Sequence, residues 1–235
     1  ARALMHEPQL VILDAPTEQP AVPVAEYVPN VRQLLGHRQT WGILISRFFL
    51  DPIWWLFVSW LPIYLADTFG FDIKQIGIFA WVPYVGAMIG SLGGGWLSGR
   101  LIGAGWSVDK ARKVVITLGG AIMAPALLGA VLATDPVWAV ITIAFVLFGF
   151  QIAIGNIQTL PGDIFSGKSV GSVAGLGGMA AVAGTLITTW LVPAMTHQSY
   201  APIFILVAAL VPASLLALWL VTGRVEKLDG PATPR

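Results

Sequence analysis

The sequence predicts an all-α membrane protein with six transmembrane helices and both termini in the cytoplasm. Three observations indicate this: charged residues are scarce, apolar residues gather into long stretches, and basic residues collect on one side. Hydrophobic residues make up 56% of the 235-residue chain and charged residues 11%, and mean hydropathy is +0.78. A soluble domain has about 25% charged residues. So little charge cannot cover a surface that faces water, and lipid is the expected solvent.

Six stretches have the length of about 20 mostly apolar residues that a helix needs to cross a hydrocarbon core of about 30 Å. These predicted spans are residues 40–65, 76–99, 114–132, 137–159, 169–194 and 200–221. Short segments with Asp, Gly, Pro, Thr and Ser separate several of them, as expected of turns. Residues 1–39 and 222–235 are predicted to be cytoplasmic tails, the first of them a largely flexible linker.

Lysine and arginine residues are divided unequally between the two sides that these spans create. The side with both termini receives eleven basic residues, whereas the other side receives only Lys74. The remaining basic residue, Arg47, lies within a span. Cytoplasmic loops carry an excess of Lys and Arg, so this asymmetry places both termini in the cytoplasm.

The composition gives no support to several classes of site. The net charge of +1 offers no basis for a nucleic-acid partner, and a chain without cysteine has no disulfide and no thiolate metal site. His6, His37 and His197 lie outside the spans, and none has a second ligand at metal spacing. We therefore expect no metal and no catalytic residue. The first residue is Ala, which fits a fragment or a truncated reading frame.

Polar side chains are concentrated in four of the six spans. The third and sixth spans have no charged or amide side chain in their interiors, whereas the other four carry Arg47, Asp51, Tyr84, Ser91, Gln151, Asn156, Gln158, Thr185, Thr188 and Thr189. Polar groups inside a membrane usually face the protein interior or a wet cavity. We expect four helices to line a cavity and two to face lipid.

The segment from Arg47 to Trp54 carries the strongest functional signal. Arg47 and Asp51 are four residues apart, so they share one helix face and can pair, and Trp54 continues this stripe. At about 1.5 Å per residue, Asp51 lies about 16 Å into the span, near the bilayer centre, and Pro52 predicts a kink beside it. Two roles remain open: Asp51 neutralises an Arg47 that extends to the interface, or the pair contacts a ligand.

Three amides in the fourth span are further candidates, together with Tyr84 in the second. Gln151 and Gln158 are seven residues apart and share a face, whereas Asn156 points well away from it. Uncharged amides offer both donors and acceptors to hydroxylated or carboxylated solutes. Hydrogen bonding between helices is the alternative role for each amide.

Glycines at four-residue spacing favour close helix packing over ligand contact. They are Gly86, Gly90 and Gly94 in the second span, and Gly171 and Gly175 in the fifth. Small residues at this spacing let two helix backbones approach each other.

Three stretches resemble the C-terminal half of a major facilitator superfamily permease, and more narrowly the hexuronate-transporter branch of the anion:cation symporter family. They are "RQTWGILISRFFLDPIWWLFVSWLPIYL", "GSLGGGWLSGRLIGAGWSVDKARK" and "GNIQTLPGDIFSGKSVGSVAGLGG". The resemblance, which extends from about Leu35 to the end of the sixth span, implies a twelve-helix sugar-acid permease of a bacterial inner membrane. It further implies proton symport without another cofactor, a small organic anion as ligand, and a cavity lined by the first, second, fourth and fifth spans of this half.

The same resemblance identifies a gating loop between the second and third spans, with Arg100, Lys110, Arg112 and Lys113. Two residues depart from its pattern: Gly99 replaces an acid, and Ala104 replaces an arginine. The N-terminal half that the family joins to these spans is absent from the sequence. An inserted fragment that does not transport is therefore the alternative to half of a solute carrier.

The first residues resemble part of an ATP-binding-cassette ATPase. Residues 10–14 read as a buried strand that ends in the magnesium-holding acid Asp14. No phosphate-binding loop of the form G-x-x-x-x-G-K-[ST] occurs in the sequence, and Ala15 stands where the catalytic base would follow. We therefore interpret this segment as the connection between permease halves; a recombination scar or gene-calling artefact, and remotely an ATPase-related segment fused to a permease, are alternatives.

Overall fold

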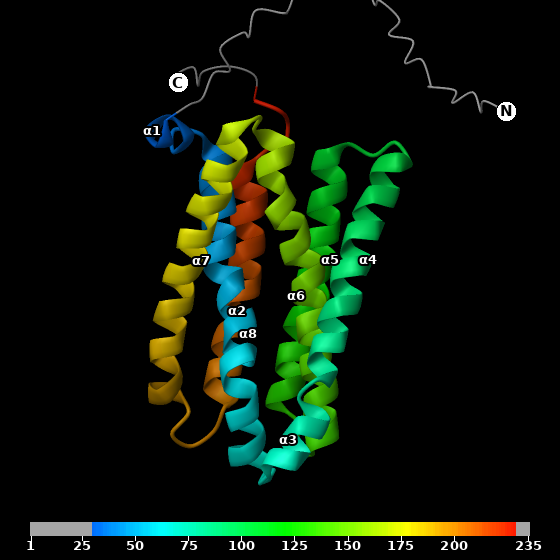
Figure 1. Cartoon of the computed structure of the whole chain (residues 1–235), viewed down its shortest axis with the longest axis vertical. Helices are drawn as coiled ribbons and strands as arrows, with labels where there is room; N and C mark the ends of the chain where they lie inside the picture. Colours follow the sequence, from blue (N-terminus) through cyan, green and yellow to red (C-terminus); the bar gives the residue numbers. More distant parts are fainter. Residues whose placement is uncertain (1–29, 229–235) are drawn as a thin grey trace, which may run out of the picture.

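The computed structural model describes residues 30–228, which are helical with short connections (Figure 1). No strand occurs among these residues. The elements are α1 (Val31–Leu34), α2 (Arg38–Phe69), α3 (Ile73–Phe79), α4 (Val82–Gly103), α5 (Val108–Val131), α6 (Pro136–Ile164), α7 (Lys168–Met195), α8 (Ala201–Leu216) and the π-helical turn η1 (Ala217–Thr222).

Six helical segments are long and apolar enough to cross a membrane, which confirms the predicted all-α class with six membrane-spanning helices. The first of them, α2, continues through Pro52 and Pro62 without interruption. The second consists of α3 followed by α4, a division that the hydropathy pattern did not reveal. Pro83 at the start of α4 explains this break, because in a continuous helix its ring would clash with the carbonyl of Phe79 and it has no N–H to donate.

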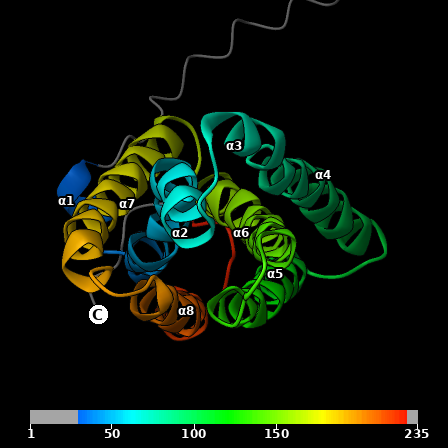
Figure 2. The same ribbon diagram turned by 90° about the horizontal axis from the view of Figure 1, so that it is seen from below.

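The helices form two uneven layers around a core that contains residues such as Phe57, Ile116 and Leu147. Seen from below, α7, α2, α6 and α4 follow one another across the bundle, and α8 and α5 lie on one side of this row, in the lower part of the view (Figure 2). The closest associations are α4 with α6, α5 with α6, and α2 with α7. The two helices of the second layer are the two that the sequence predicts to face lipid.

Glycines create the close contact between α4 and α6. A Cβ atom at Gly90 would overlap the carbonyl of Phe148, and one at Gly94 would lie 2.8 Å from the Cα of Ile152. Gly86 makes the same kind of approach to Ala144. The three glycines therefore act in helix packing, as their spacing predicts.

The expectation for the glycines of α7 needs a correction. A Cβ atom at Gly171 or Gly175 would meet nothing within 4 Å among the described residues. Gly184 instead fits against the backbone of Phe48, and a Cβ atom at Gly177 would lie 3.2 Å from Cδ of Arg47. Gly177 and Gly184 thus hold α7 against α2, because they occur on the helix face that meets α2.

The described ends of the chain pack onto the same end of the bundle. Arg38 at the start of α2 donates hydrogen bonds to the carbonyls of Val221 and Leu220, at 2.9 and 2.8 Å. The predicted N-terminal tail contains the capped helix α1, in which Leu34 is fully buried. In the predicted C-terminal tail, the amide of Val225 donates to Asp109. Both segments therefore belong to the folded bundle.

Two predictions for the N-terminal region concern residues outside those that the structure describes. They are the largely flexible linker up to residue 29 and the ATPase-like stretch at residues 1–17. The remainder of the predicted C-terminal tail, residues 229–235, also lies outside the described range.

Candidate functional site

An ion pair lies inside the first membrane-spanning helix. Arg47 donates from Nε to one oxygen of Asp51 at 3.2 Å and from a terminal nitrogen to the other at 3.3 Å. The side chains are only 14% and 11% exposed. The helix sets this geometry, since residues four apart are neighbours on its surface. A guanidinium and a carboxylate joined by two parallel bonds form a paired, neutral unit inside the membrane-spanning segment.

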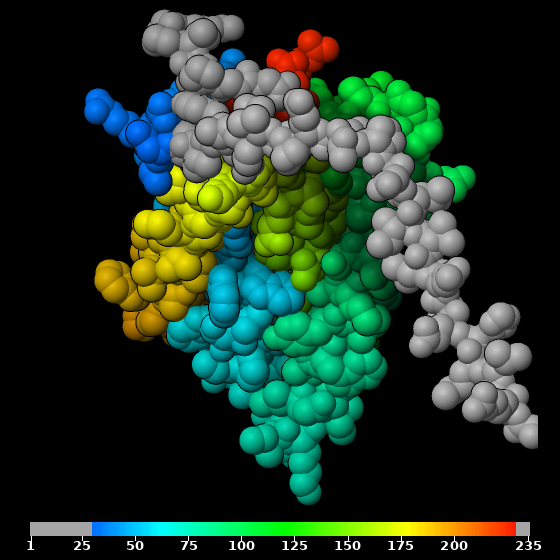
Figure 3. Space-filling view, turned by 45° about the horizontal axis from the view of Figure 1, so that its top comes forward, coloured from blue at the N-terminus to red at the C-terminus, as the bar shows by residue number. Residues whose placement is uncertain are grey.

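Neighbouring helices fix the position of this stripe. The aliphatic part of Arg47 lies against Gly177 of α7. One turn beyond Asp51, Trp54 stacks on Phe150 of α6 with ring centroids 5.6 Å apart, and it meets the ring of Tyr84 of α4 edge-on at 6.1 Å. Trp54 and Phe150 both lie near the middle of their helices. The stripe is therefore held between α7, α6 and α4, whose surfaces flank α2 in Figure 3.

The amides of α6 lie in two different environments. Gln151 is partly exposed and Gln158 is exposed, and Gly155 between them meets nothing within 4 Å. Gln151 follows Phe150 directly, so it lies at the level of Trp54. This open face of α6 agrees with the shared face that the sequence predicts for the two glutamines.

Asn156 lies elsewhere, and its predicted grouping with cavity-lining residues needs a correction. It is 1% exposed. Its amide nitrogen donates to the carbonyls of Gly94 and Ile152, and its oxygen accepts from Arg112 at 3.1 Å. Asn156 therefore joins α6 to α4 and α5, because it points away from the face of the glutamines.

Arg112 joins three helices at the end of the bundle that carries both described chain ends. Its Nε donates to Asp163 at 2.8 Å, and a terminal nitrogen donates to the hydroxyl of Ser98 at 2.9 Å as well as to Asn156. Ser98 is in α4, Arg112 is in α5, and Asp163 is near the end of α6. The carboxylate partner of Arg112 thus comes from α6.

The other predicted gating residues have different partners. Lys113 pairs with Asp109 at 2.7 Å, donates to the carbonyl of Gly223, and lies 5.2 Å from the ring of Trp219. Arg100 lies over Trp96, and Lys110 lies over Trp106 at 4.3 Å. Arg100 and Lys110 remain exposed at the surface.

A polar cavity of about 560 Å³ lies at the opposite end of the bundle, between the ends of α2, α5 and α7 and the start of α8. The hydroxyl of Tyr200 donates to Asp67 at 2.9 Å across its lining. Burial, together with the negative charge of Asp67, raises the pKa of Tyr200 to about 12. This bond fastens the start of α8 to the end of α2.

Sequence reasoning missed several residues that complete these sites. Asp163 and Ser98 are partners of Arg112, and Gly177 supports Arg47. The spacing of Gly177, Ala181 and Gly184 was an available signal for the α2–α7 contact. A partner as distant in sequence as Asp163 leaves no such local signal.

Comparison with known proteins relates the chain to transporters. The family model described as the Major Facilitator Superfamily matches residues 4–152, so the match includes most of the ATPase-like stretch. The hexuronate transporter of Escherichia coli (strain K12) is 33% identical over 197 residues, which are 82% of this chain and 45% of that protein. The galacturonate transporter of Dickeya chrysanthemi is 38% identical over 93 residues, 39% of this chain and 27% of that protein.

A third relative, the D-galactonate transporter of Escherichia coli O6:H1 (strain CFT073), is 28% identical over 201 residues, 83% of this chain and 45% of that protein. The chain thus spans less than half the length of these curated relatives. Six membrane-spanning helices and transporter relatives identify a multi-pass membrane protein. The match to the family model covers more than half of the chain, and the chain belongs to the Major Facilitator Superfamily.

Proposed function

We propose that this chain is the C-terminal half of a permease that carries a small organic anion, a sugar acid such as a hexuronate, by proton-coupled alternating access. The observation that carries the proposal is the buried pair of Arg47 and Asp51 inside a membrane-spanning helix. Relatives that are hexuronate, galacturonate and D-galactonate transporters support the ligand class. An N-terminal half and the surrounding lipid bilayer are the partners that this proposal requires.

Arg47 is the group that recognises the carboxylate of the solute. Its guanidinium already holds two carboxylate oxygens, those of Asp51, in a forked arrangement. A sugar acid offers the same pair of acceptors, so the solute carboxylate can replace Asp51 without a change in the hydrogen-bonding pattern. Lysine offers no equivalent fork, so recognition depends on arginine at this position.

Asp51 links a proton to this exchange. While Asp51 is ionised, it competes with the solute for Arg47. If the solute displaced it, the ionised Asp51 would remain unpaired inside the membrane, and burying that charge costs about 2.5–3.5 kcal/mol. Protonation makes Asp51 neutral and frees Arg47 for the solute. Proton and anion therefore bind together, and their charges cancel.

The open face of α6 supplies contacts to the rest of the solute. Gln151 lies at the level of Trp54, and its amide offers a donor and an acceptor to sugar hydroxyls. Gln158 continues the same face about 10 Å along the helix. The excess of basic residues on the side of both described chain ends supports a cytoplasmic position for that side, in the inner membrane of a bacterium.

Uptake of labelled glucuronate or galacturonate into proteoliposomes tests the proposal in the complete permease. An inward proton gradient should drive accumulation by the unchanged protein. Asp51→Asn should lower gradient-driven uptake at least about tenfold while exchange of internal for external solute continues, because solute binding no longer requires a proton.

Arg47→Lys should weaken binding of the same solutes, and Lys227→Gln, in the exposed C-terminal segment, serves as the control without effect. Full gradient-driven uptake by Asp51→Asn would contradict the proposed coupling. A complete permease that binds neither sugar acid would contradict the proposed ligand.

A further inference from the structure

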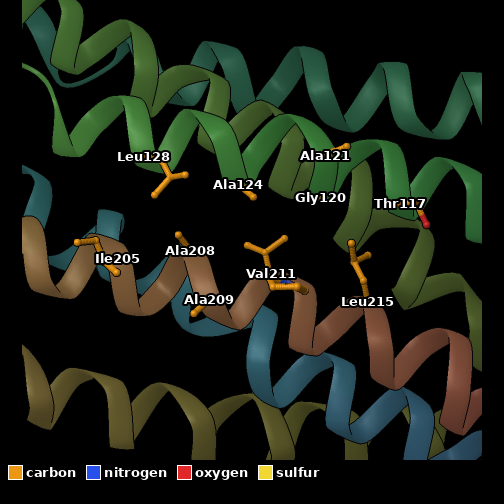
Figure 4. Close-up of a pocket in the computed structure, with 11 residues that line it drawn as sticks. Thr117, Gly120, Ala121, Ala124, Leu128, Ile205, Ala208, Ala209, Val211 and Leu215 are labelled. Carbon is orange, nitrogen blue, oxygen red and sulfur yellow. The ribbon is translucent and has the colours of Figure 1, made fainter.

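A second cavity opens on the outer side of α5 and α8. It is separate from the polar cavity beside Tyr200 and from the stripe of Arg47, Asp51 and Trp54 on α2. It has a volume of about 460 Å³ and runs along the two helices (Figure 4). Ala121 and Ala124 of α5 face Ala208 and Ala209 of α8 across it, and Leu128 and Ile205 lie at one end. We call this cavity the α5–α8 groove.

The sequence explains why the groove exists. The two helices touch at Gly120, where a Cβ atom would lie 2.8 Å from Leu215 and 3.3 Å from Val211. Along the rest of the groove four of the lining residues are alanines, which are too short to fill the space between the helices. In a packed protein interior such a space would be closed by larger side chains.

The lining offers nothing to a polar solute. Thr117 is the polar side chain among the lining residues. Its hydroxyl donates to the carbonyl of Lys113 at 2.7 Å and accepts from the indole of Trp219 at 3.0 Å. The hydrogen-bonding capacity of Thr117 is thus used inside the protein, so the groove suits a hydrocarbon occupant and not a sugar acid.

The groove faces the hydrocarbon core of the membrane. α5 and α8 form the second layer of the bundle, on one side of α2 and α6 (Figure 2). α5 is long and apolar enough to cross the membrane, and so is α8 together with η1. An opening between their outward faces meets acyl chains.

The length of the groove matches the thickness of the hydrocarbon in one leaflet. Lys113 and Trp219, residue types typical of the membrane interface, lie against each other at its Thr117 end. Thr117 is one helical turn below Lys113, and the groove continues from Thr117 to Leu128, about 16 Å along the axis. Half of a hydrocarbon core of about 30 Å is about 15 Å.

Exposed cations lie beyond the same end. Lys110 precedes Lys113 by about one turn, and Arg224 follows the glycine whose carbonyl Lys113 binds. The side chain of Arg224 is 80% exposed, and its contact with Glu226 is long, at 3.9 Å. These two cations are available to a phosphate at the membrane surface.

We propose that the α5–α8 groove is a binding site for one acyl chain of a phospholipid from the leaflet on the side of both described chain ends, with the phosphate near Lys110 and Arg224. The lipid fills the space that the alanines leave between the helices. It is retained longer than lipids that touch the convex surfaces of the bundle, because the groove contacts the chain from two helices.

Photolabelling in a bilayer tests this site. The protein is placed in vesicles of phosphatidylethanolamine and phosphatidylglycerol that contain a small fraction of phosphatidylglycerol with a diazirine on one acyl chain. After illumination, labelled positions are mapped by peptide mass spectrometry. Labelling of the groove residues should exceed that of Leu216 and Leu220, which are exposed on the same helical segment outside the groove, at least about threefold.

Filling the groove gives the matched comparison. Ala124→Leu with Ala208→Leu should reduce groove labelling to the level of Leu216, and Ala183→Leu, on the exposed surface of α7, should leave it unchanged. Ala121→Leu, at an exposed lining position, replaces the double variant if that variant does not fold. Even labelling of all exposed positions, or enrichment that survives in the filled variants, would overturn the proposal.

Discussion

Arg112 and Asp163 form a 2.8 Å ion pair that fastens the start of α5 to the end of α6, although 51 residues separate them in the sequence. The same guanidinium reaches Ser98 of α4, so one side chain ties together three membrane-spanning helices. The side chains of the pair are 16% and 20% exposed. A bond of this kind holds one end of the bundle closed only while both charges are present.

Asp163→Asn should therefore loosen that end of the bundle. The substitution keeps the shape of the side chain but leaves the charge of Arg112 without its carboxylate, at an expected cost of about 1–3 kcal/mol in stability. A lower midpoint of thermal unfolding in detergent would show it. Glu226→Gln is the control, because its exposed pair with Arg224 contributes little. Equal midpoints for the two variants would contradict the role of Arg112.

Gly90→Ala should destabilise the protein, because the added Cβ would overlap the carbonyl of Phe148 and push α4 away from α6. Overpacking of this kind typically costs about 1–3 kcal/mol. Gly93→Ala, on the same helix, adds a Cβ atom in open space and should be neutral or slightly stabilising, since Ala favours a helix. The difference between their thermal midpoints measures the contact. A Gly90→Ala protein as stable as Gly93→Ala would show that the helices do not approach there.

The double variant Arg47→Gln with Asp51→Asn separates the two roles that the sequence leaves open for this pair. Removing one partner of a buried pair leaves an unpaired charge and costs about 3–5 kcal/mol, whereas removing both charges costs much less. We expect the double variant to be more stable than Asp51→Asn alone and yet to bind no sugar acid. Calorimetric titration with glucuronate checks the second part. Normal binding of glucuronate by a stable double variant would show that the pair has a structural role and does not bind the solute.

Tyr200 should make stability fall at alkaline pH. Its pKa is about 12 in the folded protein, above its usual value of about 10, so the folded state holds the phenolic proton more tightly than the unfolded state does. This stabilisation is present in full below about pH 10 and is lost as pH rises from about 10 to 12.

Thermal midpoints at about pH 9 and about pH 11.5 measure this loss. Tyr200→Phe should show a smaller decrease between the two conditions, because the phenol that titrates and its bond to Asp67 are both gone. An equal decrease in the two proteins would assign the alkaline effect to other groups.

The sequence was sufficient for the spans because each one must present about 20 apolar residues to lipid, whatever its neighbours are. It did not reveal the break between α3 and α4, because the chain stays apolar through Ala80 and Trp81 and hydropathy does not register the effect of Pro83. The Asn30 capping box with Gln33 was a readable signal for α1 that the prediction of a flexible linker passed over.

The candidate site was predictable to the extent that it lies on single helices. Arg47 and Asp51 pair across one turn, and Gln151 and Gln158 share a face, so helical spacing alone places them. The sequence predicts that Asn156 points away from the glutamines, but it does not predict the hydrogen bond from Arg112, which comes from another helix. Contacts between helices depend on packing that no local pattern encodes.

Labelling of single cysteines along α6 with a water-soluble thiol reagent tests most directly whether this face borders the path of the solute. This chain has no cysteine of its own. Any cysteine in the rest of the permease is replaced first, so that each introduced thiol is measured alone. In the complete permease, Gln151→Cys and Gln158→Cys should react, glucuronate should protect Gln151→Cys, and the buried control Asn156→Cys should stay unlabelled. Reaction at Asn156→Cys with none at Gln151→Cys, or no protection by any sugar acid, would contradict the account.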